Sequence, residues 1–360
     1  MKGLFLIAKI TIILILVAAG GFASLLAYLT ITEYRPKPVE AVEIAGSAKR
    51  SASRYVQAGV PLKIVAWNIG YGALDASEDF FMDGGKTVRS PKARVEENIK
   101  GVREFIVQSA ADIILLQEVD VRSHRSYYID EAAYLAEKWI GSTTFAPNFL
   151  TTFVPFPFPE CIGAVKSGVL TMNAFISTEA SRIALPVPFK WPVRVANLKR
   201  CLLVERLPVA GGGELVLVNL HLEAYSSGEG RMAQMNLLID FLKVEYAKGN
   251  YCIAGGDFNQ TFPGVDERVF RVKNTEHFVP GILSPDMLPA GWRFATGAGT
   301  PSSRLLNEPY SGDPETTQLY VIDGYILSPN TELTSVNTVD AGFRYSDHNP
   351  VSLEVVLRRE

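Results

Sequence analysis

The stretch from residue 10 to residue 31 constrains the chain more than any other feature, because it contains no charged side chain. It reads ITIILILVAAGGFASLLAYLTI. A helix rises about 1.5 Å per residue, so a helix of this length crosses a hydrocarbon core of roughly 30 Å. The stretch therefore predicts a membrane-spanning helix, and we assign residues 1–31 to an N-terminal membrane anchor.

The flanking charges predict the orientation of this helix. Lys2 and Lys9 precede the apolar stretch, whereas Arg35 and Lys37 follow it and are partly offset by Glu33. Under the positive-inside rule, this pattern places the N-terminus in the cytoplasm and the rest of the chain outside it. We expect a membrane-anchored protein whose main domain is extracytoplasmic.

A cleaved signal peptide is the alternative. The small residues Ala18, Ala19 and Gly20 lie near a potential cut, and cleavage would release a secreted protein. However, the apolar core of a signal peptide is normally only about 7–15 residues long. A cut here would also leave the apolar residues 25–31 on the mature chain. An uncleaved anchor is therefore favoured, and a helix buried in a soluble domain is the least favoured reading.

Composition and charge exclude several classes of protein. The chain of 360 residues is 48% hydrophobic and 20% charged, which is typical of a globular domain and not of a disordered chain. Its formal net charge of −3 disfavours a basic protein that coats nucleic acid. Cys161, Cys201 and Cys252 lie far apart without CxxC spacing, so we expect neither a structural zinc site nor a disulfide scaffold.

The rest of the chain is predicted to be a linker followed by one domain. Residues 32–60 contain Pro36, Pro38, Gly46 and the polar run SAKRSASR, which is typical of a linker. From residue 61 to residue 360, apolar segments alternate with loops. Helices are predicted from Ser90 as N-cap with Pro91 at the first helical position, and over residues 130–139 and 231–246. Strands are predicted over residues 62–67, 112–117, 168–175, 201–207, 214–220, 251–254, 320–327 and 351–357.

This mixture of strand and helix favours a layered α/β (α+β) sandwich. A Rossmann sheet is disfavoured because the sequence lacks its glycine fingerprint.

Polar side chains recur where the predicted strands end. A carboxylate or amide that follows a buried strand is costly to leave unpaired, so these side chains are expected to converge at one edge of the core. The set is Asn68, Glu118, His221, Asp257, Asn259, Asp323, Asp347 and His348.

The chemistry of this set points to a metal-assisted reaction. Its four carboxylates repel one another unless a cation lies among them. Oxygen ligands favour Mg²⁺, with Mn²⁺ as the alternative, over Zn²⁺. Amides and histidines supply donors for phosphate oxygens, and an Asp–His pair can stabilise an imidazolium as phosphoryl charge develops. The residues alone therefore predict metal-assisted hydrolysis of a phosphate ester.

The motifs that carry these residues occur in a recognisable order. They are NIG near residue 68, LLQEVD at 115–120, NLHLEA at 219–224, GGDFNQ at 255–260, IDGYIL at 322–327 and YSDHNPV at 345–351. Together they resemble the endonuclease/exonuclease/phosphatase superfamily, and the resemblance covers residues 61–360. It implies a DNase I-like fold, a four-layered α/β/β/α sandwich, here preceded by the transmembrane helix. It also implies phosphoester cleavage by metal-activated water.

The resemblance further implies roles for the metal-side and phosphate-side residues. Glu118 is the principal Mg²⁺ ligand, with Asn68 and Asp347 beside the metal. Asn68 and Asn259 hold oxygens of the substrate phosphate. Arg125 is a further candidate contact to the phosphate, and a salt bridge is the alternative reading of this side chain.

The catalytic roles implied by the resemblance fall on four more side chains. Asp257 orients or deprotonates the attacking water, and His348 is a base or transition-state stabiliser oriented by Asp323. His221 corresponds to a histidine that can serve as acid for the leaving group, and no carboxylate that pairs with it is apparent in the sequence.

The substrate class is left open by the sequence. One hypothesis is a membrane-anchored phosphodiesterase with nuclease-like activity. A second is a hydrolase of lipid headgroups or small phosphate esters, in which Phe153, Phe156 and Phe158 enter the membrane interface; a packed loop is the alternative for residues 145–158. A third is a binding protein that keeps the fold without catalysis. No obligate protein partner is expected.

Overall fold

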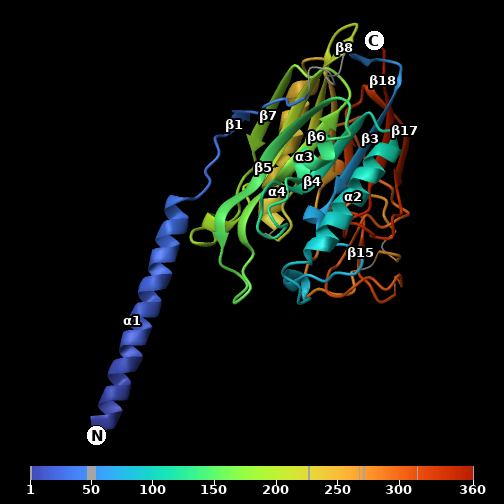
Figure 1. The fold of residues 1–360 in the computed structure, drawn as a ribbon. Coiled ribbons are helices and arrows are strands. Elements are labelled where there is room, and N and C mark those ends of the chain that lie inside the picture. Colours follow the sequence, from blue (N-terminus) through green and yellow to red (C-terminus); the bar gives the residue numbers. More distant parts are fainter. Residues whose placement is uncertain are drawn as a thin grey trace.

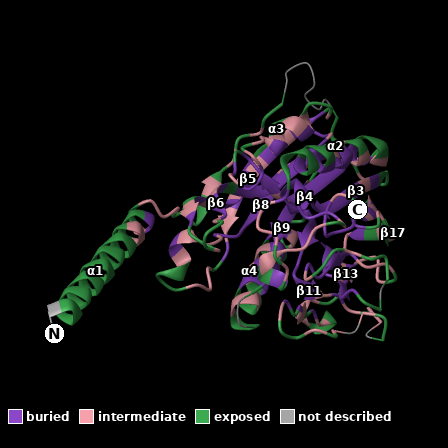
Figure 2. Cartoon of the chain, turned by 60° about the horizontal axis from the view of Figure 1, so that its bottom comes forward, coloured by how far each residue is buried: buried purple, intermediate pink, exposed green. Residues whose placement is uncertain are grey.

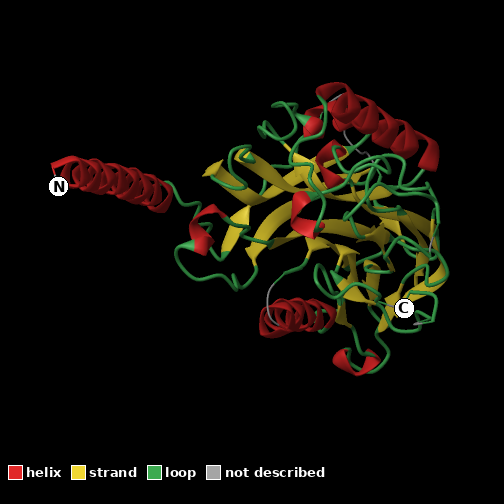
Figure 3. Ribbon diagram, turned by 90° about the horizontal axis from the view of Figure 1, so that it is seen from below, coloured by secondary structure: helices red, strands yellow, loops and turns green. Residues whose placement is uncertain are grey.

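Two β-sheets packed face to face form the centre of the protein. The computed structural model describes residues 2–46, 54–225, 228–266, 268–270, 272–313 and 315–359. Helices cover the outer faces of both sheets, and a long helix at the N-terminus projects away from the domain (Figure 1). The view from below shows the strands lying between helices on the two outer sides (Figure 3). The predicted four-layered α/β/β/α sandwich is confirmed.

The larger sheet has the strand order β1-β7-β8-β9-β10-β16-β13, and β2 pairs with β8. Strand β10 runs parallel to β9 and antiparallel to β16. The strands are β1 (Val39–Ala41), β2 (Val56–Gln57), β7 (Glu179–Ala184), β8 (Cys201–Ala210), β9 (Glu214–His221), β10 (Tyr251–Asp257), β13 (Arg293–Ala295) and β16 (Asp323–Leu327).

The smaller sheet has the strand order β17-β18-β3-β4-β6-β5, and β3 runs parallel to β4. Its strands are β3 (Pro61–Asn68), β4 (Ile113–Asp120), β5 (Ser142–Val154), β6 (Gly163–Asn173), β17 (Thr331–Thr338) and β18 (Val351–Leu357). Two further pairs of short strands are β11 (Gln260–Thr261) with β12 (Gly281–Ile282), and β14 (Ser303–Arg304) with β15 (Leu319–Tyr320).

The helices complete the layers. The α-helices of the described residues are α1 (Lys2–Ile31), α2 (Lys92–Ser109), α3 (Glu131–Ala136) and α4 (Gly228–Tyr246). Their short 3-10 helices are η1 (Gly70–Gly72), η2 (Phe81–Asp83), η3 (Val193–Ala196) and η4 (Pro285–Met287). Apolar side chains of α2 pack on the outer face of the smaller sheet, and those of α4 pack on the outer face of the larger sheet.

Alternation along the strands produces the three apolar layers. In β3, Leu62 and Ile64 point into the core between the sheets, whereas Val65 and Trp67 point toward α2. A strand buried on both faces is therefore largely apolar, and β3 has an unbroken apolar run from Ile64 to Trp67. Figure 2 shows the sheets as the buried part of the molecule and α1 as exposed along most of its length.

Several elements differ in detail from the sequence-based predictions. The helix predicted from Ser90 begins at Lys92 with Pro91 as its N-cap, because the Ser90 hydroxyl donates instead to the carbonyl of Ala73. The aromatic segment 145–158 lies largely in strand β5, and the strand predicted over 320–327 is divided between β15 and β16.

The segment predicted as a linker contributes two short strands. Within residues 32–60, β1 pairs with β7 and β2 pairs with β8. The part of the polar run at residues 47–53 lies outside the described residues. Where it is described, this segment therefore adds strands to the larger sheet, and Ala45 forms a bridge to Thr143 of β5 in the smaller sheet.

The buried carboxyl group of Glu205 links the two sheets through hydrogen bonds. Glu205 on β8 is fully buried and accepts hydrogen bonds from Thr144 on β5 and Asn173 on β6. Burial raises the pKa of Glu205 to about 7, although the hydrogen bonds to its carboxylate oppose this shift. The folded protein consequently binds a proton at Glu205 more tightly than the unfolded chain does.

This carboxyl group predicts a pH dependence of stability. As the pH rises from the unfolded pKa of 4.5 to about 7, ionisation of Glu205 lowers the free energy of unfolding by up to about 3 kcal/mol. We expect Glu205→Gln to remove this loss and to be more stable than the wild type near neutral pH. Chemical denaturation of the full chain in detergent, on both sides of this pH window, measures the effect. Equal pH profiles of Glu205→Gln, the exposed-site control Glu104→Gln and the wild type would contradict it.

Candidate active site

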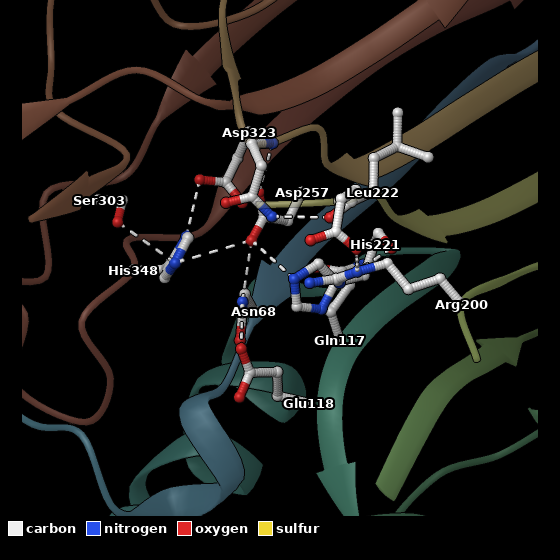
Figure 4. Close-up of polar contacts among 12 residues, drawn as sticks. Asn68, Gln117, Glu118, Arg200, His221, Leu222, Asp257, Ser303, Asp323 and His348 are labelled. Atoms are coloured by element: carbon white, nitrogen blue, oxygen red, sulfur yellow. Dashed lines mark hydrogen bonds and ion pairs between the residues drawn. The ribbon is translucent and has the colours of Figure 1, made fainter. Parts of the chain in front are cut away.

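Strand ends from both sheets bring the predicted polar residues to one edge of the sandwich. In the larger sheet, Asp257 at the end of β10 lies opposite His221 of the parallel strand β9 and Asp323 of the antiparallel strand β16. In the smaller sheet, Asn68 at the end of β3 lies opposite Gln117 of β4. Figure 4 shows these side chains pointing toward one another across the gap between the sheets. The set predicted from the strand ends therefore forms a single cluster.

Asn68 links the two halves of this cluster. Its amide Nδ2 donates to Glu118 Oε1 at 3.2 Å and to Asp257 Oδ2 at 3.0 Å. Its Oδ1 accepts a hydrogen bond from the backbone amide of Gly70 at 3.1 Å, which fixes the orientation of the side chain. Both amide hydrogens of Asn68 are thus used to hold carboxylates of different sheets together.

Glu118 is placed by an irregularity in strand β4. The pairing of β4 with β6 shifts register between Leu116 and Val119, and Glu118 adopts a positive φ of 54°. A β-bulge of this kind re-aims a side chain that would otherwise follow the alternation of the strand. Glu118 is half-buried, so its carboxylate reaches the cluster while part of the side chain stays accessible.

Asp347 is the second carboxylate on this side of the cluster. Burial raises its pKa to about 6; the nearby positive charge of His348 lowers it, and Glu118 raises it. The Ser346 hydroxyl donates to Asp347 Oδ1 at 3.3 Å. The carboxylate oxygens of Glu118 and Asp347 form a donor pair that fits a hard divalent cation.

His348 is held as a cation by a carboxylate behind it. Its Nδ1 donates to Asp323 Oδ2 at 2.8 Å, and that oxygen also accepts from the Ser302 hydroxyl at 2.7 Å. Burial by itself lowers the pKa of His348, but Asp323, Asp347 and Asp257 together raise it well above its usual value. The imidazolium Nε2 lies 3.2 Å from the Ser303 hydroxyl and 3.8 Å from Asp257 Oδ2.

Asp257 occupies the centre of the cluster. Its Oδ2 accepts from Asn68, and its Oδ1 accepts from the backbone amide of Asn259 at 2.9 Å. Burial and the neighbouring Asp323 raise the pKa of Asp257 to about 7, while His348 and the hydrogen bonds oppose the rise. Asn259 itself has a positive φ of 53° and donates through Nδ2 to the carbonyl of Leu222.

His221 approaches Asp257 from the side opposite His348. Its Nε2 lies 3.5 Å from Asp257 Oδ2, so the carboxylate near this histidine is Asp257 itself. Burial, the charge of Arg200 and the charge of His348 lower the pKa of His221 well below its usual value. One carboxylate therefore lies between a cationic histidine and a neutral one.

The charge state of His348 decides where a metal fits. Asp257, Asp323 and His348 bring ligand-type atoms within 4.8 Å of one another. A protonated imidazole cannot bind a metal, however, because both of its nitrogens carry protons. The carboxylates of Glu118 and Asp347 therefore fit a divalent cation better than this group does.

Arg125 does not fit its predicted role as a phosphate contact. Its guanidinium donates to both carboxylate oxygens of Asp120, each at 3.0 Å, and lies 3.6 Å above the ring of Tyr71. The side chain is almost fully buried in this arrangement. The salt bridge given as the alternative reading is present, with Asp120, five residues earlier, as its acceptor.

Residues outside the predicted set also surround the site, among them Arg200, for which the sequence left open a phosphate contact or a salt bridge. Arg200 supports His221 by donating to its backbone carbonyl at 3.2 Å, and it pairs with Glu223 at 3.3 Å. Tyr225 donates to Asp83 at 3.3 Å near the same edge. Glu223 lies inside the quoted motif NLHLEA, whereas Arg200 and Asp83 lie outside the quoted motifs.

Solved structures with a similar fold include two bacterial proteins. An endonuclease/exonuclease/phosphatase from Beutenbergia cavernae is 17% identical, with 83% of this chain and 72% of that chain covered and a TM-score of 0.55. A family protein from Bacteroides thetaiotaomicron is 16% identical, with 83% of this chain and 99% of that chain covered and a TM-score of 0.51. At these identities the likeness supports the fold alone.

Family membership follows from the sequence comparison. No curated protein matches the chain. The model of the Endonuclease/Exonuclease/phosphatase family matches residues 65–306, which include the strands that carry Asn68, Glu118, His221 and Asp257. The protein therefore belongs to the endonuclease/exonuclease/phosphatase family.

Proposed function

We propose that the protein is a divalent-metal-dependent phosphodiesterase that is anchored in a membrane with its catalytic domain outside the cytoplasm. Family membership and the fold support a phosphoester hydrolase in general. The observation that carries the finer proposal is the position of Asp257 between a cationic His348 and a neutral His221, next to the Glu118–Asn68 link.

In this proposal the residues on the metal side bind the divalent cation. Glu118 and Asp347 would hold Mg²⁺ or Mn²⁺, with Asn68 beside the ion. A bound divalent cation supplies positive charge that polarises a phosphoryl oxygen and stabilises charge in the transition state. The raised pKa of Asp347 supports this assignment, because a cation relieves the repulsion that Glu118 exerts on it.

The remaining residues act on the substrate and on water. Asp257 orients the attacking water and can accept its proton, since a pKa of about 7 lies close to neutral pH. His348 stabilises the developing phosphoryl charge as an imidazolium, and Asp323 holds it in that state. Asn259, whose Nδ2 has a second hydrogen beside the one donated to Leu222, would donate to the phosphate, and Asn68 would do so by exchanging one of its carboxylate partners for a phosphate oxygen.

For His221 we propose a role weaker than that of the acid expected from the resemblance. A histidine whose pKa is well below its usual value is a poor proton donor at neutral pH. We therefore propose that neutral His221 donates a hydrogen bond to the leaving-group oxygen. Its Nε2 faces the cluster, 3.5 Å from Asp257 Oδ2, and this nitrogen would carry the hydrogen that is donated (Figure 4).

The anchor is proposed to be uncleaved. The apolar part of α1, Gly3–Ile31, has a mean hydropathy of 2.5 and could span a membrane, although a signal sequence has the same character. The last turn of α1 supports retention of the helix, because Leu29 is buried against the domain and Thr30 accepts a hydrogen bond from Trp191. The charges on either side of the span favour an extracytoplasmic domain.

Removal of His348 tests the catalytic proposal. We expect His348→Ala to lower kcat on bis-p-nitrophenyl phosphate by roughly a hundredfold or more, because the imidazolium stabilises the transition state. His124→Ala, which removes a histidine outside the cluster, is the control and should keep near-normal turnover. Steady-state rates of the full chain in detergent measure both. A folded His348→Ala protein with wild-type kcat would contradict the mechanism, and a wild type without activity on any phosphoester would support a binding protein instead.

Metal binding can be tested without an activity assay. We expect Mn²⁺ to raise the thermal unfolding temperature of the wild type. At a concentration about 100 times the dissociation constant, one bound ion adds about 2.7 kcal/mol to the free energy of unfolding. Glu118→Gln should lose most of this effect, and Glu104→Gln on the surface of α2 should retain it. The same Mn²⁺ response in all three proteins would rule out Glu118 as a ligand.

A further inference from the structure

The outer end of α1 is built into the catalytic domain. The indole nitrogen of Trp191 donates to Thr30 Oγ1 at 3.1 Å, and the hydroxyls of Thr32 and Thr152 lie 3.2 Å apart. Leu29 is buried in the same contact. The loop before η3 and the far end of β5 therefore lie against the last turn of the helix.

An ionic cluster around the buried carboxylate of Glu33 stabilises this contact. Glu33, two residues after α1, has a side chain that is only 1% exposed. It pairs with Arg194 at 2.9 Å, with Arg35 at 3.0 Å and with Lys199 at 3.5 Å. Arg194 and Lys199 belong to the domain, so their pairs with Glu33 tie the end of α1 to it.

Large apolar side chains are exposed around this junction. Phe156 and Phe158 lie in the connection between β5 and β6, and Phe158 is 89% exposed. Trp191 and Val193, beside the end of α1, are also more than half exposed. We call these four residues the docking surface. Aromatic side chains concentrate at the boundary between lipid and water, and the end of a membrane span lies at that boundary.

Basic residues accompany the docking surface. A cavity of about 420 Å³ opens beside the end of α1 and is lined by Arg35, Arg194, Lys199 and Arg200, together with apolar side chains such as Phe189. Glu33 is the acid in its lining. This excess of positive charge suits the phosphate groups of anionic lipids.

The docking surface and the active site face the same way. In Figure 1 the tip of the β5–β6 hairpin and strand β15 lie in the lower part of the domain, the side toward which α1 extends. Strand β15 pairs with β14, whose Ser303 contacts His348. The ring of Phe156 lies 5.5 Å from that of Phe81 in η2, so the hairpin is also packed against a loop at this edge.

We propose that the docking surface rests in the interfacial layer of the membrane that α1 spans, and that the enzyme cleaves phosphoesters presented at that lipid surface. Continuity with α1 identifies lipid as the occupant, because the apolar span is itself uncovered by the domain. The substrate class is then a phosphodiester carried by a lipid headgroup. This inference rests on the proposed anchor and the proposed hydrolase activity.

Fluorescence quenching by lipid tests the docking surface independently of activity. The full chain, in a Trp191→Phe background, is reconstituted into vesicles of phosphatidylcholine and phosphatidylglycerol that carry brominated acyl chains. A Phe158→Trp reporter is placed at the hairpin, and a Val107→Trp reporter on α2 is the matched control. Val107 is also exposed, but α2 lies on the opposite side of the domain from α1 (Figures 1 and 2).

We expect brominated lipid to quench the Phe158→Trp reporter at least about twofold more than the Val107→Trp reporter, since only the former touches acyl chains. Equal quenching of the two reporters would overturn the proposal. Quenching that requires a high ratio of protein to lipid would also overturn it, because it would assign the surface to a second copy of the chain.

Turnover on two substrates tests the consequence for function. We expect the double variant Phe156→Ser/Phe158→Ser to hydrolyse vesicle phospholipid about tenfold more slowly than the wild type, because two aromatic side chains no longer enter the interface. Its rate on soluble bis-p-nitrophenyl phosphate should be unchanged. The control Val107→Ser/Ile140→Ser removes two exposed apolar side chains elsewhere and should match the wild type on both substrates.

The possible outcomes separate the two proposals. Equal losses on both substrates, or no loss on vesicles, would contradict the role of the docking surface. A wild type without hydrolysis of either substrate would contradict the proposed function, and the quenching experiment would still decide whether the surface contacts lipid.

Discussion

The hydrogen bonds that join the two sheets at one edge are the constraint on which the rest of the structure depends. Gln117 on β4 donates to Asn219 Oδ1 on β9 at 2.8 Å, and Asn219 donates in turn to the carbonyl of Leu170 on β6 at 3.0 Å. These amides are fully buried, and a buried polar group without a partner costs about 1–3 kcal/mol. The sheets therefore cannot slide past each other without a large loss. Asn68 extends the same linkage into the active site, where it holds Glu118 of one sheet to Asp257 of the other.

This fixed register creates an electrostatic arrangement that neither sheet could produce alone. Asp323 from the larger sheet keeps His348 protonated, whereas burial and the nearby Arg200 keep His221 neutral. Both histidines approach Asp257, whose own pKa is raised to about 7. Groups with such different proton affinities within one small volume can divide the tasks of charge stabilisation and proton transfer. The carboxylates of Glu118 and Asp347 beside them offer oxygen ligands for a cation.

The connection between α1 and the domain relates the active site to the proposed membrane contact. Glu33 lies directly after the apolar span and pairs with Arg35, Arg194 and Lys199, so it links the end of α1 to the domain. The cavity at this junction is lined by Arg200, which also supports His221 through its backbone carbonyl. Arg200 thus links the lining of this cavity to the active site, which supports the proposed substrate at the bilayer surface.

The sequence alone determined the features that depend on local pattern. The apolar span, the strands that are buried on both faces and the polar residues at their ends follow from spacing along the chain, and they gave the correct layers and the clustered residues from Asn68 to His348. Tertiary structure decided what depends on neighbours distant in sequence. Arg125 pairs with Asp120 and lies above the ring of Tyr71. Glu205 accepts hydrogen bonds from side chains of the opposite sheet. The two histidines differ in charge because different groups surround them. Spacing along a chain predicts which face a side chain occupies, but its partners and its pKa are set only when the two sheets pack together.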